Sequence, residues 1–115
     1  MRHEVRELLD VVTEEEQRTA RQIASLEATV AGIVEASELV STDDEHDPEG
    51  ATIAYERAQA SALLRQARAD LEALSETRRR LERDGRVPCE SCGRDIAPAR
   101  LAALPTASRC VDCAG

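Results

Sequence analysis

Apolar residues recur at alternating intervals of four and three residues along the first third of the chain. Of the eleven positions in this stripe, eight are apolar, and a mean spacing of about 3.5 residues is typical of a left-handed coiled coil. The stripe predicts a long amphipathic helix. Its members are Val5, Leu9, Val12, Glu16, Thr19, Ile23, Leu26, Val30, Ile33, Ser37 and Val40.

The same periodicity returns after an interruption of about ten residues and predicts a second long helix. Residues 41–50 contain five acids, a proline and a glycine, a composition that does not continue a helix. Gly85 is expected to end the second helix as a left-handed cap. The second stripe consists of Ile53, Arg57, Ala60, Leu64, Ala67, Leu71, Leu74, Arg78 and Leu81.

Two long helices joined by a short segment are expected to fold back on each other as an antiparallel hairpin. About 36 residues at a rise of 1.5 Å give a predicted length of about 55 Å. In this fold, facing stripe positions have numbers that sum to 93 or 94, which places Glu16 opposite Arg78 and Ser37 opposite Arg57. We predict a Glu16–Arg78 ion pair that sets the register, because a slip would bury Arg78 against an apolar partner. The alternative is a dimer of long helices, but the opposite charges favour the hairpin and a monomer.

The composition agrees with an elongated helical protein better than with a compact globule. The chain has no Trp, no Phe, one Tyr and 33% charged residues. The net charge of −8 argues against nucleic acid as the main partner. Residues 1–50 carry 14 acids and 4 arginines (−10), and residues 51–115 carry 9 acids and 11 arginines (+2). With no apolar run of membrane-spanning length and a charged N-terminal sequence, we expect a cytoplasmic protein without a membrane span or signal peptide.

Four cysteines near the C-terminus form two C-x2-C pairs separated by 17 residues. This spacing is typical of a zinc site, and four thiolates close the tetrahedral shell, so we expect one structural zinc ion and no catalytic one. Redox use of the two pairs is the alternative. His3 and His46 are expected to be surface residues. The predicted ligands are Cys89, Cys92, Cys110 and Cys113.

The segment around these cysteines predicts a small folded module. Gly93 allows a tight turn over the first pair, and residues 98–105 read as a short helix with a proline at each end. The predicted fold is all-α, with an antiparallel coiled-coil hairpin in residues 1–85 (tip 41–52) and a four-cysteine zinc finger in residues 86–115 at its base. The expected core of the module is Val87, Ile96, Leu101, Leu104 and Val111.

Two clusters of charge are candidate contact surfaces. The acids of the tip could reach a magnesium ion or a basic wall in a partner, although such runs are commonly solvated loops. They are Asp43, Asp44, Glu45, Asp47 and Glu49. A possible docking patch, for an acidic protein surface or for nucleic acid, consists of Arg78, Arg79, Arg80, Arg83 and Arg86.

The cysteine module resembles the zinc finger of the DksA/TraR family. The resemblance rests on the segments 89–93, 100–101, 105–107 and 110–113 together with Ile96, and the hairpin with its Asp47-Pro48 tip is similar to the coiled coil of that family. It implies a non-enzymatic transcription regulator that binds RNA polymerase, inserts its coiled coil into the secondary channel and modulates initiation, often together with ppGpp.

The chain departs from the family pattern at three positions. Gly50 stands where the family has a second tip aspartate, and Thr52 stands where it has an alanine. Leu104 replaces the basic residue that other members use for ppGpp, so we expect weak or absent ppGpp binding. The rival functions are a zinc-stabilised coiled-coil adaptor without polymerase activity and, with less support because aromatic residues for base stacking are scarce, a DNA-binding zinc protein.

Overall fold

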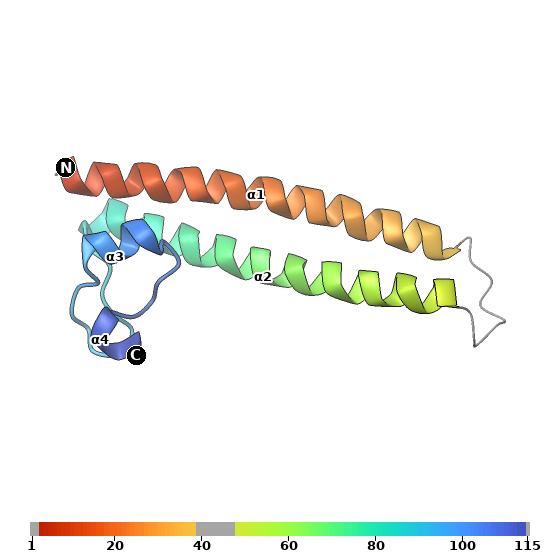
Figure 1. Cartoon of the computed structure of the whole chain (residues 1–115). Coiled ribbons are helices and arrows are strands. Elements are labelled where there is room, and N and C mark those ends of the chain that lie inside the picture. The colour runs from red at the N-terminus through yellow and green to blue at the C-terminus, as the bar shows by residue number, and fades with distance from the viewer. Residues whose placement is uncertain (1–2, 39–47, 115) are drawn as a thin grey trace. The chain divides into compact units, whose positions relative to one another are not determined.

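A computed structural model describes residues 3–38 and 48–114 (Figure 1). In chain order the helices are α1 (His3–Glu38), α2 (Pro48–Asp84), α3 (Pro98–Ala103) and α4 (Val111–Ala114). Within these two described ranges the chain forms no strand, and an isolated antiparallel bridge joins Pro88 to Asp95. The all-α prediction is therefore confirmed.

Helix α2 begins earlier than the periodicity indicated. We expected a non-helical tip over residues 41–52, but residues 48–52 belong to α2. Pro48 is the first residue of the helix, where its missing N–H costs nothing and its fixed φ suits helical geometry. Gly50 is tolerated close behind it, in the same first turn. Val40, which the sum of 93 would place opposite Ile53, lies outside the described ranges.

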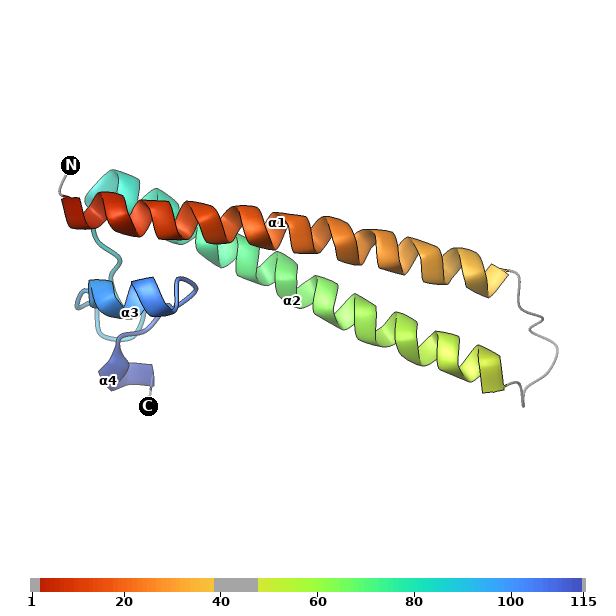
Figure 2. The ribbon, with the colours of Figure 1, turned by 45° about the horizontal axis from the view of Figure 1, so that its top comes forward.

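The chain divides into two compact units, Met1–Thr19 with Ala69–Gly115, and Ala20–Arg68. The first unit contains the start of α1, the end of α2 and the cysteine module. Here α1 and α2 are antiparallel: a Cβ added at Gly85 would lie 3.9 Å from Cγ2 of Val5, and Glu16 contacts Arg78. Figures 1 and 2 both show these two helix segments side by side, with α3 next to them. The domain division at residue 85 stays a prediction.

The second unit is a pair of antiparallel helix segments. Glu27 and Arg68 form an ion pair of 3.3 Å, while Ser37 and Ile53 line one cavity of about 360 Å³. Higher-numbered residues of α1 thus lie near lower-numbered residues of α2, as an antiparallel pair requires. Small and aliphatic side chains close the interface, with Ala60, Leu64 and Ala67 buried.

The buried positions follow the predicted stripes closely. Val5, Val12, Thr19, Leu74 and Leu81 are buried, and most other stripe members are half-buried.

Two further positions differ from the stripe prediction. Leu8 is also buried, whereas the adjacent stripe residue Leu9 is half-buried. Arg57, expected in the seam opposite Ser37, is exposed, and the Ser37 hydroxyl donates instead to the Val34 carbonyl. A long guanidinium side chain can leave a seam for solvent without moving its backbone.

None of the described helices is both long enough and apolar enough to cross a membrane.

Candidate metal centre

The first cysteine pair lies in a tight hairpin turn that follows helix α2. Gly85, with φ of +70°, ends α2, and its N–H donates to the Leu81 carbonyl at 3.0 Å. The chain then turns at Gly93, whose φ of +77° favours glycine because a Cβ is strained there. The N–H of Gly93 donates to the Cys89 carbonyl and the N–H of Cys89 donates to the Arg94 carbonyl. Both predicted glycine roles are confirmed.

The second pair lies at the start of the short helix α4. The N–H groups of Cys113 and Ala114 both donate to the Cys110 carbonyl, at 3.1 and 3.0 Å. This turn brings the sulfurs of Cys110 and Cys113 to the same side of the chain. A hydrogen bond from the Glu90 N–H to the Ser108 carbonyl, 2.9 Å long, ties the two cysteine pairs together.

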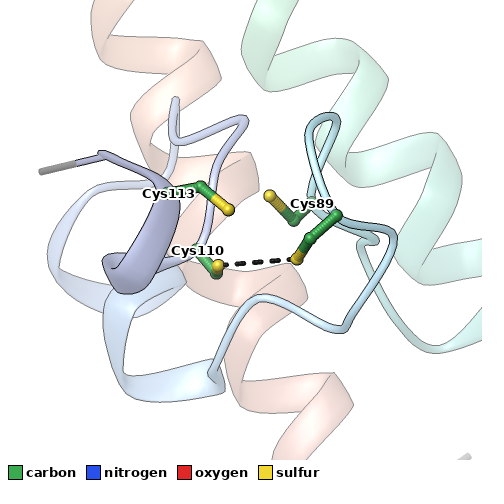
Figure 3. A group of neighbouring side chains, drawn as sticks. Cys89, Cys110 and Cys113 are labelled. Carbon is green, nitrogen blue, oxygen red and sulfur yellow. Dashed lines mark hydrogen bonds between the residues drawn. The ribbon is translucent and has the colours of Figure 1, made fainter.

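The four sulfur atoms form one cluster. All of them lie within 4.8 Å of one another, and Sγ of Cys92 is 3.7 Å from Sγ of Cys110. Figure 3 shows Cys89, Cys110 and Cys113 converging from two separate turns. Tetrahedral zinc with bonds of about 2.3 Å requires sulfurs about 3.8 Å apart, so the cluster fits a zinc ion. The cluster can therefore hold one zinc ion, with all four positions taken by sulfur.

The surroundings of the cluster shift the pKa values of Cys89 and Cys113 in opposite directions. Three backbone N–H groups, first that of Cys110 and then those of Cys92 and Ser91, lower the pKa of Cys89 to about 6. The pKa of Cys113 is raised to about 12, first through Cys110 and then through Cys89. Four negative sulfurs at this distance repel one another, and a divalent cation removes that repulsion.

Arg94 is a residue of the centre that the sequence analysis missed. Its N–H groups, first that of the backbone and then those of the side chain, lower the pKa of the Cys92 thiol, and the thiolate raises the pKa of Arg94 in turn. Asp112 lies 3.8 Å from the same guanidinium. An arginine directly after a C-x2-C-G turn is the sequence signal that could have indicated this contact.

The metal centre shares one hydrophobic core with the helix ends of its unit. Cys89 and Cys110 are 3% and 8% exposed, and they belong to the same buried cluster as Val12 and Leu81. Leu101 of α3, 1% exposed, is also part of it. Two of the four ligands are thus held by packing as well as by their turns.

Thr77 adds a polar link that the periodicity did not indicate. It is buried on α2, and its hydroxyl lies 3.1 Å from the Ala73 carbonyl and 3.3 Å from the Pro105 carbonyl. The second contact joins α2 to the segment that follows α3. The sequence signal is weak, since Thr77 lies one helical turn after the stripe residue Leu74.

The predicted core of the cysteine module is right in three positions and wrong in two. Val87, Ile96 and Leu101 are buried. Leu104 and Val111 are 47% and 69% exposed, so they are surface residues. The physical reason is that so small a module has one small core, which faces α1 and α2 and is already full.

Each arginine of the proposed docking patch has an acidic neighbour. Arg78 pairs with Glu16 and Glu82, and Arg79 and Arg80 both pair with Glu76. The two remaining members also have partners: Arg83 pairs with Asp84, and Arg86 with Asp95. The patch is therefore largely neutralised, and its docking role stays a prediction.

The acidic tip residues fall outside the described ranges or at their edge. Asp43, Asp44, Glu45 and Asp47 lie outside the described residues. Glu49 lies in the first turn of α2, and its side chain is not among those described. The contact role of these acids stays a prediction.

Comparison with known proteins agrees with the architecture. Residues 83–115 match the family model of the prokaryotic dksA/traR C4-type zinc finger. The fold is similar to a solved structure, that of the transcription factor DksA2 from Pseudomonas aeruginosa, with a TM-score of 0.76 and 19% sequence identity. This similarity covers 96% of this chain and 80% of that one. The chain matches no curated protein sequence. The predicted resemblance of the cysteine module to the zinc finger of the dksA/traR family is therefore confirmed over residues 83–115.

Proposed function

We propose that this protein is a non-enzymatic transcription regulator that binds RNA polymerase and inserts its acidic-tipped coiled coil into the secondary channel, where it modulates initiation. The observation that carries the proposal is the combination of a dksA/traR zinc finger with a helix hairpin whose fold is similar to DksA2 over 96% of the chain.

The helix hairpin supports this role through its seam. Apolar residues close the interface between α1 and α2, and the Glu16–Arg78 pair favours one register over its neighbours. The connecting segment carries four acids, Asp43, Asp44, Glu45 and Asp47, followed by Glu49. Carboxylates of this kind suit contact with a magnesium ion or with arginines.

The zinc finger contributes stability, and ppGpp binding through it is weak or absent. Four sulfur ligands leave no open position for catalysis, which agrees with a structural role. Leu104 offers no charge to a phosphate group, and we propose that any response to ppGpp through this position is weak or lost.

The direct test is crosslinking from position 47. A photo-reactive amino acid replaces Asp47 in the zinc-loaded full chain, which is then mixed with bacterial core RNA polymerase. We expect recovery of peptides from around the catalytic magnesium site of the polymerase. If the polymerase is bound but these peptides are absent, the adaptor function is favoured; if nothing binds, the proposal fails.

A substitution pair separates binding from activity. Asp47→Asn with Glu49→Gln should abolish the effect on transcription and leave polymerase binding largely intact. The matched control is Asp10→Asn with Glu14→Gln, which removes two exposed acids from α1 and should change neither. An unchanged transcription effect in the tip variant would contradict the proposed role of the acids.

A further inference from the structure

An open groove lies on the surface of the zinc finger, between α3 and α4. It has a volume of about 550 Å³. Its aliphatic lining includes Ala99, Ala103, Leu104 and Val111, and we call it the finger groove. Leu104 and Val111 are the two large aliphatic residues of the finger that its small core does not take up, with exposures of 47% and 69%.

Exposed aliphatic side chains gathered in a groove are unusual on a surface this polar. One third of the residues of the chain are charged, and the larger aliphatic side chains of the finger are otherwise buried. Contiguous apolar surface with a charged rim is typical of interaction sites. The finger groove therefore has the character of a docking site for an aliphatic side chain.

The charges on the rim indicate what should accompany that side chain. Asp112 pairs with Arg94, and Asp95, which also lines the groove, pairs with Arg86. Arg100 differs: its Nε donates to the Arg109 carbonyl at 2.8 Å, and no carboxylate of the described residues pairs with it. The groove thus keeps one guanidinium that has no carboxylate partner among the described residues.

We propose that the finger groove binds an acidic segment of a partner protein, with an aliphatic side chain in the groove and a neighbouring carboxylate on Arg100. Arginine and carboxylate form the stronger class of hydrogen bond, often through two parallel contacts. The aliphatic side chain of the partner would cover the exposed surface of Leu104 and Val111. This inference goes beyond the polymerase proposal, because it concerns the finger and does not depend on the acidic tip.

The test is a selection from a random heptapeptide display library against the zinc-loaded full chain. Peptides that also bind the Leu104→Asp variant are removed. Leu104 is exposed, so this variant keeps the fold, which an unchanged melting temperature and zinc content would verify. We expect the enriched peptides to share an aliphatic residue next to Asp or Glu.

Binding of an enriched peptide is then measured by NMR titration. We expect shifts in the amides of residues 99–104 and 111, and roughly tenfold weaker binding to Arg100→Gln. Arg65→Gln, which changes an exposed arginine on α2, is the matched control and should bind as the wild type does.

Two results of the selection would overturn the proposal: no enrichment over the Leu104→Asp variant, or a consensus of basic peptides. Two results of the titration would also overturn it. The first is a shift of the groove amides with inorganic phosphate but not with peptide; the second is a concentration-dependent shift of these amides without peptide, which would assign the groove to contact between copies of the chain. The experiment is independent of RNA polymerase, so its failure leaves the proposed function standing.

Discussion

The Glu16–Arg78 pair allows a quantitative test of how the helix register is set. Arg78 Nε lies 2.9 and 3.2 Å from the two carboxylate oxygens of Glu16, and the side chains of Arg78 and Glu16 are 31% and 16% exposed. The Ser75 hydroxyl donates to the same carboxylate at 3.0 Å. The carboxylate is therefore well partnered and largely removed from solvent. The pair raises the pKa of Arg78, with Glu16 as the first cause.

The expected size of the interaction follows from its burial. Two charges about 4 Å apart at an effective dielectric constant of about 20 attract by about 4 kcal/mol, before the costs of desolvation and of ordering the side chains. Fully exposed pairs retain about 0.2–1 kcal/mol after these costs. A partly buried pair with two short contacts should retain more. We expect a coupling energy of about 1–2 kcal/mol.

The assay is a double-mutant cycle with Glu16→Gln and Arg78→Met. Urea unfolding of the zinc-loaded chain, followed by circular dichroism, gives the four free energies of unfolding. Arg78 also lies 3.4 Å from Glu82, so Glu82→Gln is measured as a control, and it should cost less than about 0.5 kcal/mol. A coupling energy below about 0.3 kcal/mol would refute the reasoning.

The role in register is tested separately from stability. Replacement of both Glu16 and Arg78 by leucine should leave stability unchanged or raise it, because an apolar pair has no desolvation cost. If the ion pair selects the register, this variant should show more than one set of NMR signals for the seam, or should associate into dimers. A single, unchanged set of signals would show that the aliphatic seam selects the register without the pair.

Four further results are expected from the same structure. Leu101→Ala, at 1% exposure, should lower the free energy of unfolding by about 2–5 kcal/mol, whereas Leu104→Ala, at 47%, should lower it by less than about 1 kcal/mol in the same urea titration. Gly32→Ala should raise the free energy of unfolding by about 0.5–1 kcal/mol, because the new Cβ would meet no atom of the described residues within 4 Å, apart from its chain neighbours and the adjacent helix backbone. Gly85→Ala should lower the free energy of unfolding, because its φ of +70° is strained for alanine. A lower free energy of unfolding in both variants would contradict the argument. Removal of zinc by a chelator should increase amide hydrogen exchange in residues 5–12 and 74–81 as well as in the finger, because these helix segments and the finger share one core. An increase confined to the finger would argue against that coupling. Hydrogen bonds first from Arg80 and then from Arg79 lower the pKa of Glu76 from its ordinary value of 4.5. The contribution of Glu76 to stability is therefore fully present above pH 4.5, and it is lost as the pH falls through the lower pKa of the folded state. Glu76→Gln should therefore show a smaller loss of melting temperature than the wild type when the pH is lowered past 4.5; equal losses would contradict this.

Local chemistry accounts for the parts of this protein that the sequence determines by itself. The apolar stripes indicate two long helices because a seam must repeat on one helix face, and the structure buries Val12, Leu74 and Leu81 accordingly. Opposite charges at Glu16 and Arg78 identify the register, since only one alignment pairs them. The four cysteines indicate zinc because their spacing suits two tight turns over one ion, and their sulfurs meet in one cluster.

Other features depend on where separate segments meet. Leu104 and Val111 look like core residues in the sequence, yet they are exposed because the helix ends and Leu101 already fill the one core available to the finger. Thr77 looks like a surface residue but is buried where α2 meets the carbonyl of Pro105. Among the described residues, Arg100 lacks an acidic partner because its neighbours are paired elsewhere. A sequence pattern specifies which face of each helix is apolar, and only the tertiary packing decides which apolar residues find room inside.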